Sequence, residues 1–431
     1  MKTTRSKASA QRVPRRWRTP PPLTRGSESL EGMEILREIG GEVGVLLWQA
    51  YRNVMFWTSV EKGERAELFS PNAGEKREAE LADARLPEEL RGPLATVGKM
   101  LADPDGMAGD AVADACTEIA RWAETEGHLN TALSYTQAAS VAAQRNARLA
   151  LAVGQLARRR GDLARAETWF RHTIMVGRQV GDWDSYSRAY IALGNMLIAR
   201  GNLPAAHRMH IKALRAARRK GLQQIQGMAL HDLFVIADEM GRDEQAEEYA
   251  RQAFRAYGPG HPSQPALAHD IAYFWMQRGH FAHAFEIFQK LEPHATEPRI
   301  RLLLTANVAR AAAGVGNKDA FRKAWTQVYR MVKDPELHGS VSNALYEVAV
   351  GAASLGEWDR AEQAAQEANE IAARLGQGKV RFHVEALLDS IKSGRATDAQ
   401  TSVSRKPQAR TDTLAADLLR TLSSNPIALT V

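Results

Sequence analysis

The chain has 431 residues, of which 44% are apolar but only 7% aromatic, and its formal net charge is +7. This length exceeds what one compact core usually supports, so it predicts several domains or one elongated array. The single cysteine, Cys116, excludes an internal disulfide framework and a multi-thiolate metal site, and it favours a reducing cytoplasm. Abundant alanine and the rarity of β-branched runs favour an all-helical fold.

The charge is distributed unevenly along the chain. Residues 1–27 carry eight Lys or Arg and no acid, whereas residues 28–156 carry 12 basic and 21 acidic side chains. Residues 157–220 reverse this balance, with 14 basic and 4 acidic side chains, and residues 221–431 hold 23 and 25. An electrostatic partner is therefore expected at the tail or at the basic block 157–220.

The N-terminal segment 1–27 is predicted to be a disordered basic tail, because it combines prolines and cations with few apolar residues. It could contact nucleic acid or an acidic surface, or it could be a solvated tail without a partner. The tail lacks the apolar core of a signal peptide. The apolar stretch 43–60 is interrupted by Gln49, Arg52 and Asn53, so no membrane span is predicted.

Residues 28–106 are predicted to form an acidic helical cap for the array that follows, since terminal repeats must cover the end of the core. Apolar residues recur at helical spacing over 30–59 despite two adjacent glycines, which predicts one or two helices. A further helix is predicted over 86–101, with Pro87 and acidic residues in its first turn. The charged segment between these helices, 61–85, is predicted to be irregular.

A triplet of small residues then recurs along the chain. It consists of a small residue, a Gly seven positions later and an Ala five positions after that. Full copies are Ala120, Gly127, Ala132; Gly154, Gly161, Ala166; Gly194, Gly201, Ala206; Ala272, Gly279, Ala284; and Ala349, Gly356, Ala361. The variants are Phe234, Gly241, Ala246, with a large first residue, and Ala309, Gly316, Ala320, which is one residue short. The turn glycines are 34, 40, 40, 38, 37 and 40 residues apart.

The triplet predicts a helical hairpin in each repeat. Two antiparallel helices that cross closely need small side chains at the crossing, and a Gly ends the first helix in the left-handed conformation. A large residue at the crossing, or a lost position in the turn, is expected to change the packing. A single hairpin cannot bury its apolar face alone, so stacked neighbours must complete the core.

This pattern resembles the tetratricopeptide repeat, and the segments LGNMLIARGNLPAAHRMHIKAL and VGQLARRRGDLARAETWFRHTI carry the resemblance most fully. It extends over about residues 112–389, and the period near 40 is similar to that of a longer-helix subtype. The resemblance implies an all-α solenoid of about seven hairpins, a superhelix over 107–392 whose concave groove is lined by the first helices. That groove is the binding surface of the family.

The family's groove positions, carried over by counting from each first-helix small residue, fall on a polar mixture that could hold an extended peptide. They are Arg148, Gln155, Arg158, Arg188, Asn195, His231, His269, Tyr273, Arg310, Asn343 and Tyr346. Asn195 stands where the chaperone-tail-binding subset keeps an Asn, but Ile191 stands where that subset keeps a Lys. The resemblance therefore does not extend to a full carboxylate clamp.

The second helix of the third repeat, 205–220, is strongly basic. Its cations are Arg208, Lys212, Arg215, Arg218, Arg219 and Lys220. They could attract phosphates or an acidic peptide, or dock against an acidic cap of this or a neighbouring chain. Second helices face outward in this family, so a solvated convex face is the alternative interpretation.

The C-terminal part, 393–431, is predicted to be a flexible linker followed by a short amphipathic helix. Residues 393–410 are rich in Ser, Thr, Ala and Gln, and leucines then recur on one side of the chain. This helix could occupy the groove of its own chain or that of a partner, or it could be a frayed tail.

No nucleotide-binding, metalloprotease, serine-hydrolase or paired-cysteine motif occurs, so neither catalysis nor a cofactor is predicted. The pairs His207 with His210 and His280 with His283 have metal-ligand spacing, but no carboxylate or thiol cluster accompanies them, so no metal is predicted. The leading hypothesis is a cytoplasmic scaffold that binds a peptide or helix of another protein. The alternative is a ligand-sensing regulator that contacts nucleic acid through its tail or basic repeats, and a homodimer is compatible with both.

Overall fold

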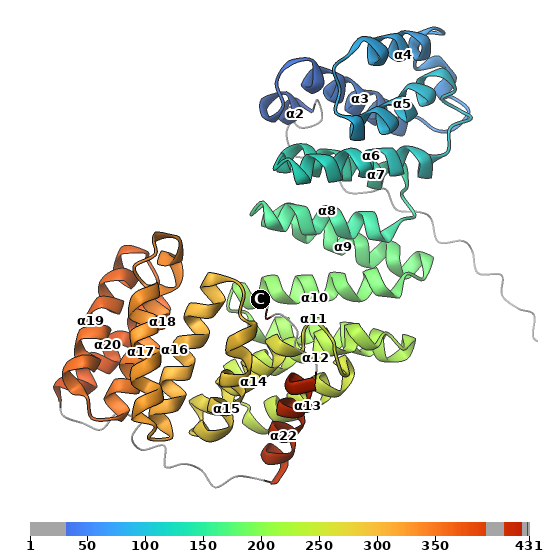
Figure 1. Cartoon of the computed structure of the whole chain (residues 1–431). Helices are drawn as coiled ribbons and strands as arrows, with labels where there is room; N and C mark the ends of the chain where they lie inside the picture. The colour runs from blue at the N-terminus through green and yellow to red at the C-terminus, as the bar shows by residue number, and fades with distance from the viewer. Residues whose placement is uncertain (1–31, 394–408, 425–428, 430–431) are drawn as a thin grey trace, which may run out of the picture. The chain divides into compact units, whose positions relative to one another are not determined.

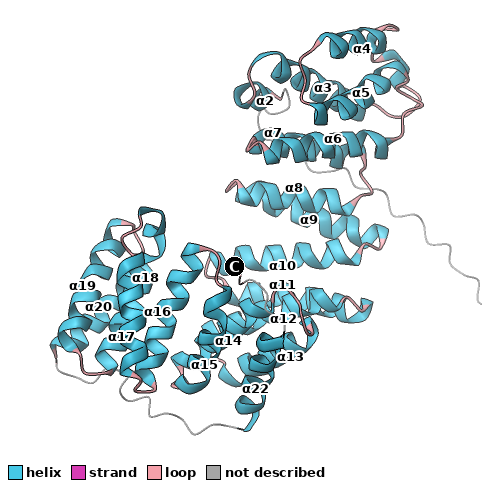
Figure 2. Cartoon of the chain, in the orientation of Figure 1, coloured by secondary structure: helices cyan, strands magenta, loops and turns pink. Residues whose placement is uncertain are grey.

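The computed structural model describes residues 32–393, 409–424 and 429. Helices make up all of the regular structure in these residues (Figure 2). The predicted basic tail and nearly all of the predicted linker lie outside the described residues. The fold class predicted from the repeats, an all-α solenoid of hairpins, is confirmed.

Two compact units make up the chain, residues 1–200 and residues 201–431 (Figure 1). Unit 1 begins with helices that precede the repeats and ends with the first helix of the third repeat. In chain order its elements are α2 (Met33–Glu38), α3 (Gly41–Ser59), η1 (Arg65–Glu67), α4 (Ala73–Asp83), α5 (Glu88–Ala102), α6 (Gly109–Thr125), α7 (Leu129–Ala142), α8 (Ala147–Arg159), α9 (Leu163–Val180) and α10 (Trp183–Ala199).

Helix α4 corrects the prediction that 61–85 is irregular, which was wrong for residues 73–83. Its sequence, AGEKREAELAD, contains strong helix formers, and an ion pair of 3.1 Å links Arg77 to Glu80 one turn later. Gly74 lets α4 approach α5, because a Cβ placed on Gly74 would lie 2.6 Å from the Cβ of Ala102. The charges of this segment lie on a packed helix.

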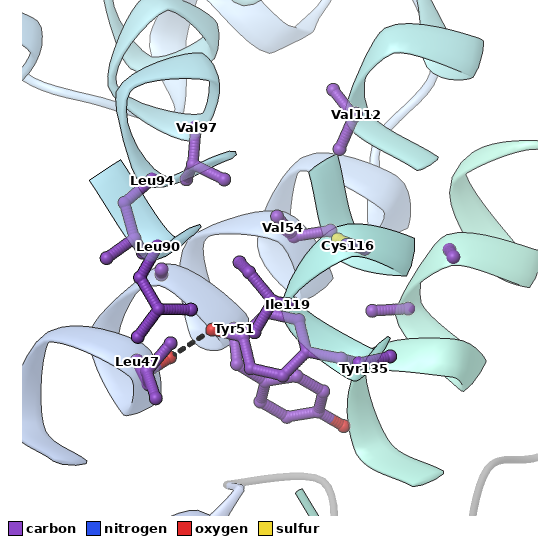
Figure 3. Close-up of a cluster of buried hydrophobic side chains, with 14 of the residues drawn as sticks. Leu47, Tyr51, Val54, Leu90, Leu94, Val97, Val112, Cys116, Ile119 and Tyr135 are labelled. Carbon is purple, nitrogen blue, oxygen red and sulfur yellow. Dashed lines mark hydrogen bonds between the residues drawn. The ribbon is translucent and has the colours of Figure 1, made fainter. Parts of the chain in front are cut away.

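A hydrophobic cluster joins the helices before the repeats to the first hairpin (Figure 3). Leu47 and Tyr51 of α3, Cys116 of α6 and Tyr135 of α7 are buried within it, and the Tyr135 hydroxyl donates to the Leu47 carbonyl. Burial raises the pKa of the Cys116 thiol to about 12, so this side chain packs as a small apolar group.

Glu38 of α2 caps the N-terminus of α7 from a distant part of the sequence. Its two carboxylate oxygens accept hydrogen bonds from the backbone amides of Asn130 and Thr131, at 2.8 and 2.7 Å, and from both side chains. Burial alone would raise the pKa of Glu38, but these four hydrogen bonds lower it below its usual value. The carboxylate satisfies amides that a helix N-terminus leaves unpaired.

Unit 2 contains the remaining repeats. Its elements are α11 (Leu203–Lys220), α12 (Gln223–Glu239), α13 (Asp243–Tyr257), α14 (Gln264–Gln277), α15 (Phe281–Leu291), η2 (Glu292–His294), α16 (Pro298–Gly314), α17 (Lys318–Met331), η3 (Pro335–Leu337), α18 (His338–Ser354), α19 (Trp358–Arg374), α20 (Gly378–Lys392) and α22 (Ala409–Ser424).

All seven predicted turn glycines have a left-handed backbone, with φ between 67° and 81°. At Gly161, the Gly161 amide donates to the Arg158 carbonyl and the Asp162 amide to the Ala157 carbonyl, which closes helix α8. The Asp162 carboxylate then caps α9 by accepting from the Arg165 amide at 3.1 Å. Asn202 after Gly201 and Asn317 after Gly316 cap the next helix in the same way.

The sixth repeat corrects a second prediction, because no position is lost after Gly316. Helix α17 begins two residues after this glycine, as the second helices of the other repeats do. The position five residues after the glycine is Phe321, which is fully buried, while Ala320 is only half-buried. The ring fits because a small residue faces it, with a Cβ on Gly351 of α18 only 3.1 Å away.

Candidate functional site

The predicted groove positions of unit 1 lie mainly on α8. Arg148, Gln155 and Arg158 are exposed, and their side chains have no ion pair or hydrogen bond with any residue that the structure describes. Their spacing of seven and three residues places them on one side of the helix. This side of α8 is a surface whose two guanidinium groups and one amide are available to a ligand.

The two candidates on α10 are less available. Arg188 is half-buried and pairs with Asp184 one turn earlier, with a distance of 2.7 Å between Nε and Oδ1. Asn195 is also half-buried, and its Oδ1 is buried without a hydrogen-bond partner in the described part of the chain. A buried amide oxygen without a donor costs free energy, and its burial keeps it out of reach of a ligand.

In unit 2 four of the predicted residues contact two carboxylates that the sequence did not single out. Asp270 of α14 lies between two imidazoles, 2.9 Å from Nε2 of His231 and 3.0 Å from Nδ1 of His269. Burial alone would raise the pKa of Asp270, but the two imidazoles hold it well below its usual value. His269 also contacts the Asn307 amide of α16 at 3.2 Å. These bonds link α12, α14 and α16.

The second carboxylate, Glu347 of α18, is buried and accepts from two predicted residues. Arg310 Nη1 of α16 lies 2.6 Å from its Oε2, and the Tyr273 hydroxyl of α14 lies 2.9 Å from its Oε1. Glu347 and burial together raise the pKa of Tyr273. Burial acts to lower the pKa of Arg310, but Glu347 raises it above its usual value. A further bond of 3.1 Å joins Arg310 to Gln277.

The last two groove candidates lie on α18. Asn343 is exposed, and Tyr346 is half-buried with its ring centre 6.1 Å from that of His383 in α20. Burial raises the pKa of Tyr346 above its usual value. Of the candidates in unit 2, the structure therefore brings together His231, His269, Tyr273 and Arg310. Asp270 joins His231 to His269, and Glu347 joins Tyr273 to Arg310. Only a comparison of the polar residues on neighbouring first helices could have suggested these two carboxylates from the sequence.

All six predicted cations of α11 are exposed. Arg218 donates to Gln252 at 2.7 Å, whereas the side chains of Arg208, Arg215 and Arg219 have no ion pair or hydrogen bond with any described residue. Their spacing of seven and four residues makes a stripe along the helix. Beneath it, His210 is fully buried, and burial lowers its pKa to about 4.

The predicted histidine pairs have separate roles. The His207 ring lies beside Tyr249, with a centroid distance of 6.5 Å, and His283 Nε2 lies 3.0 Å from Asp412 of α22. Within the described ranges, no group of three or more His, Cys, Asp or Glu side chains could hold a metal ion. In the same residues, no helix has the length and apolarity needed to cross a membrane.

The C-terminal helix α22 packs against α15 of its own chain, with Leu414, Leu418 and Leu422 buried. Because α15 is a second helix, this position lies on the opposite side of the hairpin from the first-helix positions predicted to line the groove. The hypothesis that this helix fills its own groove is therefore wrong, although it does bind its own chain.

Stacked helical hairpins with αL glycine turns define an all-α repeat protein. Residues 145–219 match the tetratricopeptide repeat family. A signal transduction ATPase with numerous domains and a tetratricopeptide repeat sensor, from Pyrococcus horikoshii, matches at 12% identity and a TM-score of 0.52, over 93% of this chain and 66% of that one.

The pilF protein of Pseudomonas aeruginosa matches at 16% identity and a TM-score of 0.43, over 54% of this chain and 98% of that one. BtubC from P. vanneervenii matches at 15% identity and a TM-score of 0.37, over 52% and 91%. No curated protein sequence matches. Residues 145–219 are therefore tetratricopeptide repeats, and repeats of this family generally form non-catalytic scaffolds for protein interaction.

Proposed function

We propose that the chain is a non-catalytic cytoplasmic scaffold that binds an acidic peptide segment of another protein on the first helices of unit 1. The observation that carries this function is the exposed, unpaired face of α8, formed by Arg148, Gln155 and Arg158. Guanidinium groups bind carboxylates through paired, charge-assisted hydrogen bonds.

The charge of this region supports an acidic ligand. The part of the basic block that lies in unit 1, residues 157–200, carries 8 basic and 4 acidic side chains, which favours the approach of negative groups to this region. The corresponding side chains of unit 2 are poorer candidates, because Arg310 and Tyr273 already bind Glu347. A ligand there would have to break a buried ion pair, which is costly.

The test is a selection of random twelve-residue peptides on the full chain, followed by affinity measurement for the enriched sequences. Acidic peptides should dominate, and Arg148→Gln with Arg158→Gln should weaken them at least tenfold. The matched control changes Arg208 and Arg215 of α11 to Gln and should leave the affinity unchanged. Enrichment of apolar or basic peptides, or equal losses in both double variants, would refute the proposal.

The stripe on α11 favours a second function, contact with nucleic acid. Arg208, Arg215 and Arg219 are exposed cations without partners among the described residues, as phosphate-binding side chains often are before binding. Anisotropy of a labelled 30-base-pair duplex at 50 and 200 mM salt tests it. Changing all three to Gln should weaken binding and reduce its salt dependence, whereas absence of binding at the lower salt excludes this function.

A further inference from the structure

A cleft in unit 1 lies between α3 and α4, away from the repeat helices. Its volume is about 370 Å³, which is within the range of small-molecule sites. Aromatic and cationic side chains line it, namely Trp48, Arg52, Phe56, Phe69, Lys76 and Arg77. The combination is unusual for its surroundings, since residues 28–106 hold 16 acidic and 9 basic side chains.

The aromatic residues offer a surface for a planar ring. Phe56 is 51% exposed, although most large apolar side chains of unit 1 are buried. The Arg52 guanidinium lies over two of these rings, 5.1 Å from the centre of Trp48 and 5.6 Å from that of Phe56. A guanidinium whose face stacks on aromatic rings still has N–H groups at its edge that can donate to a ligand.

Arg77 forms the inner part of the cleft and is only 8% exposed. Its Nη1 donates to Gln49 at 2.7 Å and pairs with Glu80 at 3.1 Å. Its Nε has no hydrogen-bond partner in the described part of the chain. Glu80 is the acidic residue of the lining and is already paired, so Arg52 and Lys76 remain as uncompensated positive charges of the cleft.

We propose that this cleft binds a small aromatic carboxylate. The ring packs between Phe56, Phe69 and Trp48, and the carboxylate contacts Arg52 and Lys76. A guanidinium edge binds the two oxygens of a carboxylate in parallel. The site is separate from the peptide-binding face of α8 and gives the scaffold a second, small-molecule ligand.

Titration calorimetry of the full chain with 2-naphthoate tests this site. We expect saturable binding, at least tenfold weaker for the neutral analogue 2-naphthalenemethanol, because the alcohol lacks the charge-assisted contacts. Arg52→Gln should weaken 2-naphthoate at least tenfold. Arg85→Gln is the matched control, since Arg85 is an exposed cation of the same region that does not line the cleft.

The Lys76→Gln variant separates a loss of binding from a loss of folding. Lys76 is exposed, so its substitution leaves the packing intact. It should weaken 2-naphthoate severalfold with an unchanged melting temperature. The proposal is overturned by absence of binding at millimolar concentration, by equal affinity for the alcohol, or by equal affinity of the Arg52→Gln and Arg85→Gln variants.

Discussion

Arginines on the first helices serve different purposes in the two units. On α8 of unit 1, Arg148 and Arg158 are exposed and have no partners in the described residues. On α16 of unit 2, Arg310 is 9% exposed and pairs with Glu347 at 2.6 Å. The repeat determines which side of a hairpin a residue occupies. The neighbouring first helix determines whether that residue is free to bind a ligand.

The largest effect should follow from removing one partner of the pair in unit 2. Arg310→Met leaves the Glu347 carboxylate buried and unpaired, which should cost about 3–5 kcal/mol. The chain has two units and unfolding need not be two-state, so hydrogen exchange of α16 and α18 is the appropriate measurement.

The matched control for that prediction is Arg188→Met in unit 1. Arg188 and Asp184 form an i, i+4 pair whose side chains are 34% and 42% exposed, so its loss should cost only about 0.3–0.5 kcal/mol. Similar small losses in both units would contradict the distinction between a buried pair and a solvated one.

A smaller effect should come from the close crossing of α8 and α9. A Cβ on Gly154 would lie 2.6 Å from the Phe170 ring, so Gly154→Ala should destabilise unit 1 by about 1–3 kcal/mol. Urea unfolding monitored by exchange in α8 measures this. Gly92→Ala in α5 is the control, since nothing lies within 4 Å of its added Cβ and a small gain in stability is expected.

Unit 1 should also lose stability in acid through Glu38. Its folded-state pKa is lower than its usual value, so its contribution is complete above about pH 4.3 and disappears as pH falls through the folded pKa. Glu38→Gln should cost about 1 kcal/mol at pH 7 and should reduce the loss of stability below pH 4. Glu126→Gln, an exposed carboxylate of the adjacent turn, should alter neither value.

The turns could be predicted from the sequence because their requirement is local. A left-handed residue at the end of a helix favours Gly, and the following Asp or Asn caps the next helix, so Gly161 and Asp162 identify both ends. The Arg310 to Glu347 pair could not be predicted, because it joins residues 37 positions apart on different helices. Helix α22 was predicted as amphipathic, but the surface it packs against depends on tertiary structure.

The sixth repeat shows how the sequence can mislead even where the rule is local. Ala320 was matched to the pattern because it is small, whereas the fold places the large Phe321 at that position and compensates with Gly351 on the next first helix. The physical requirement is a fixed combined volume across the crossing, and either helix can supply the small residue. A search for small residues in one helix alone therefore misses a repeat in which the large and the small residue have changed places between the two helices.

The substitutions that should weaken peptide binding most, at Arg148 and Arg158, should change the stability of the fold least. Arg148 and Arg158 contact no described partner, so changing both to Gln should alter the free energy of unfolding by less than about 0.5 kcal/mol. The same double variant should lose acidic-peptide binding, and the remaining affinity should depend less on salt. Thermal unfolding and peptide titration on the same samples measure both quantities. A loss of stability comparable to that of Arg310→Met would mean that these side chains support the fold, and the distinction between the two units would fail.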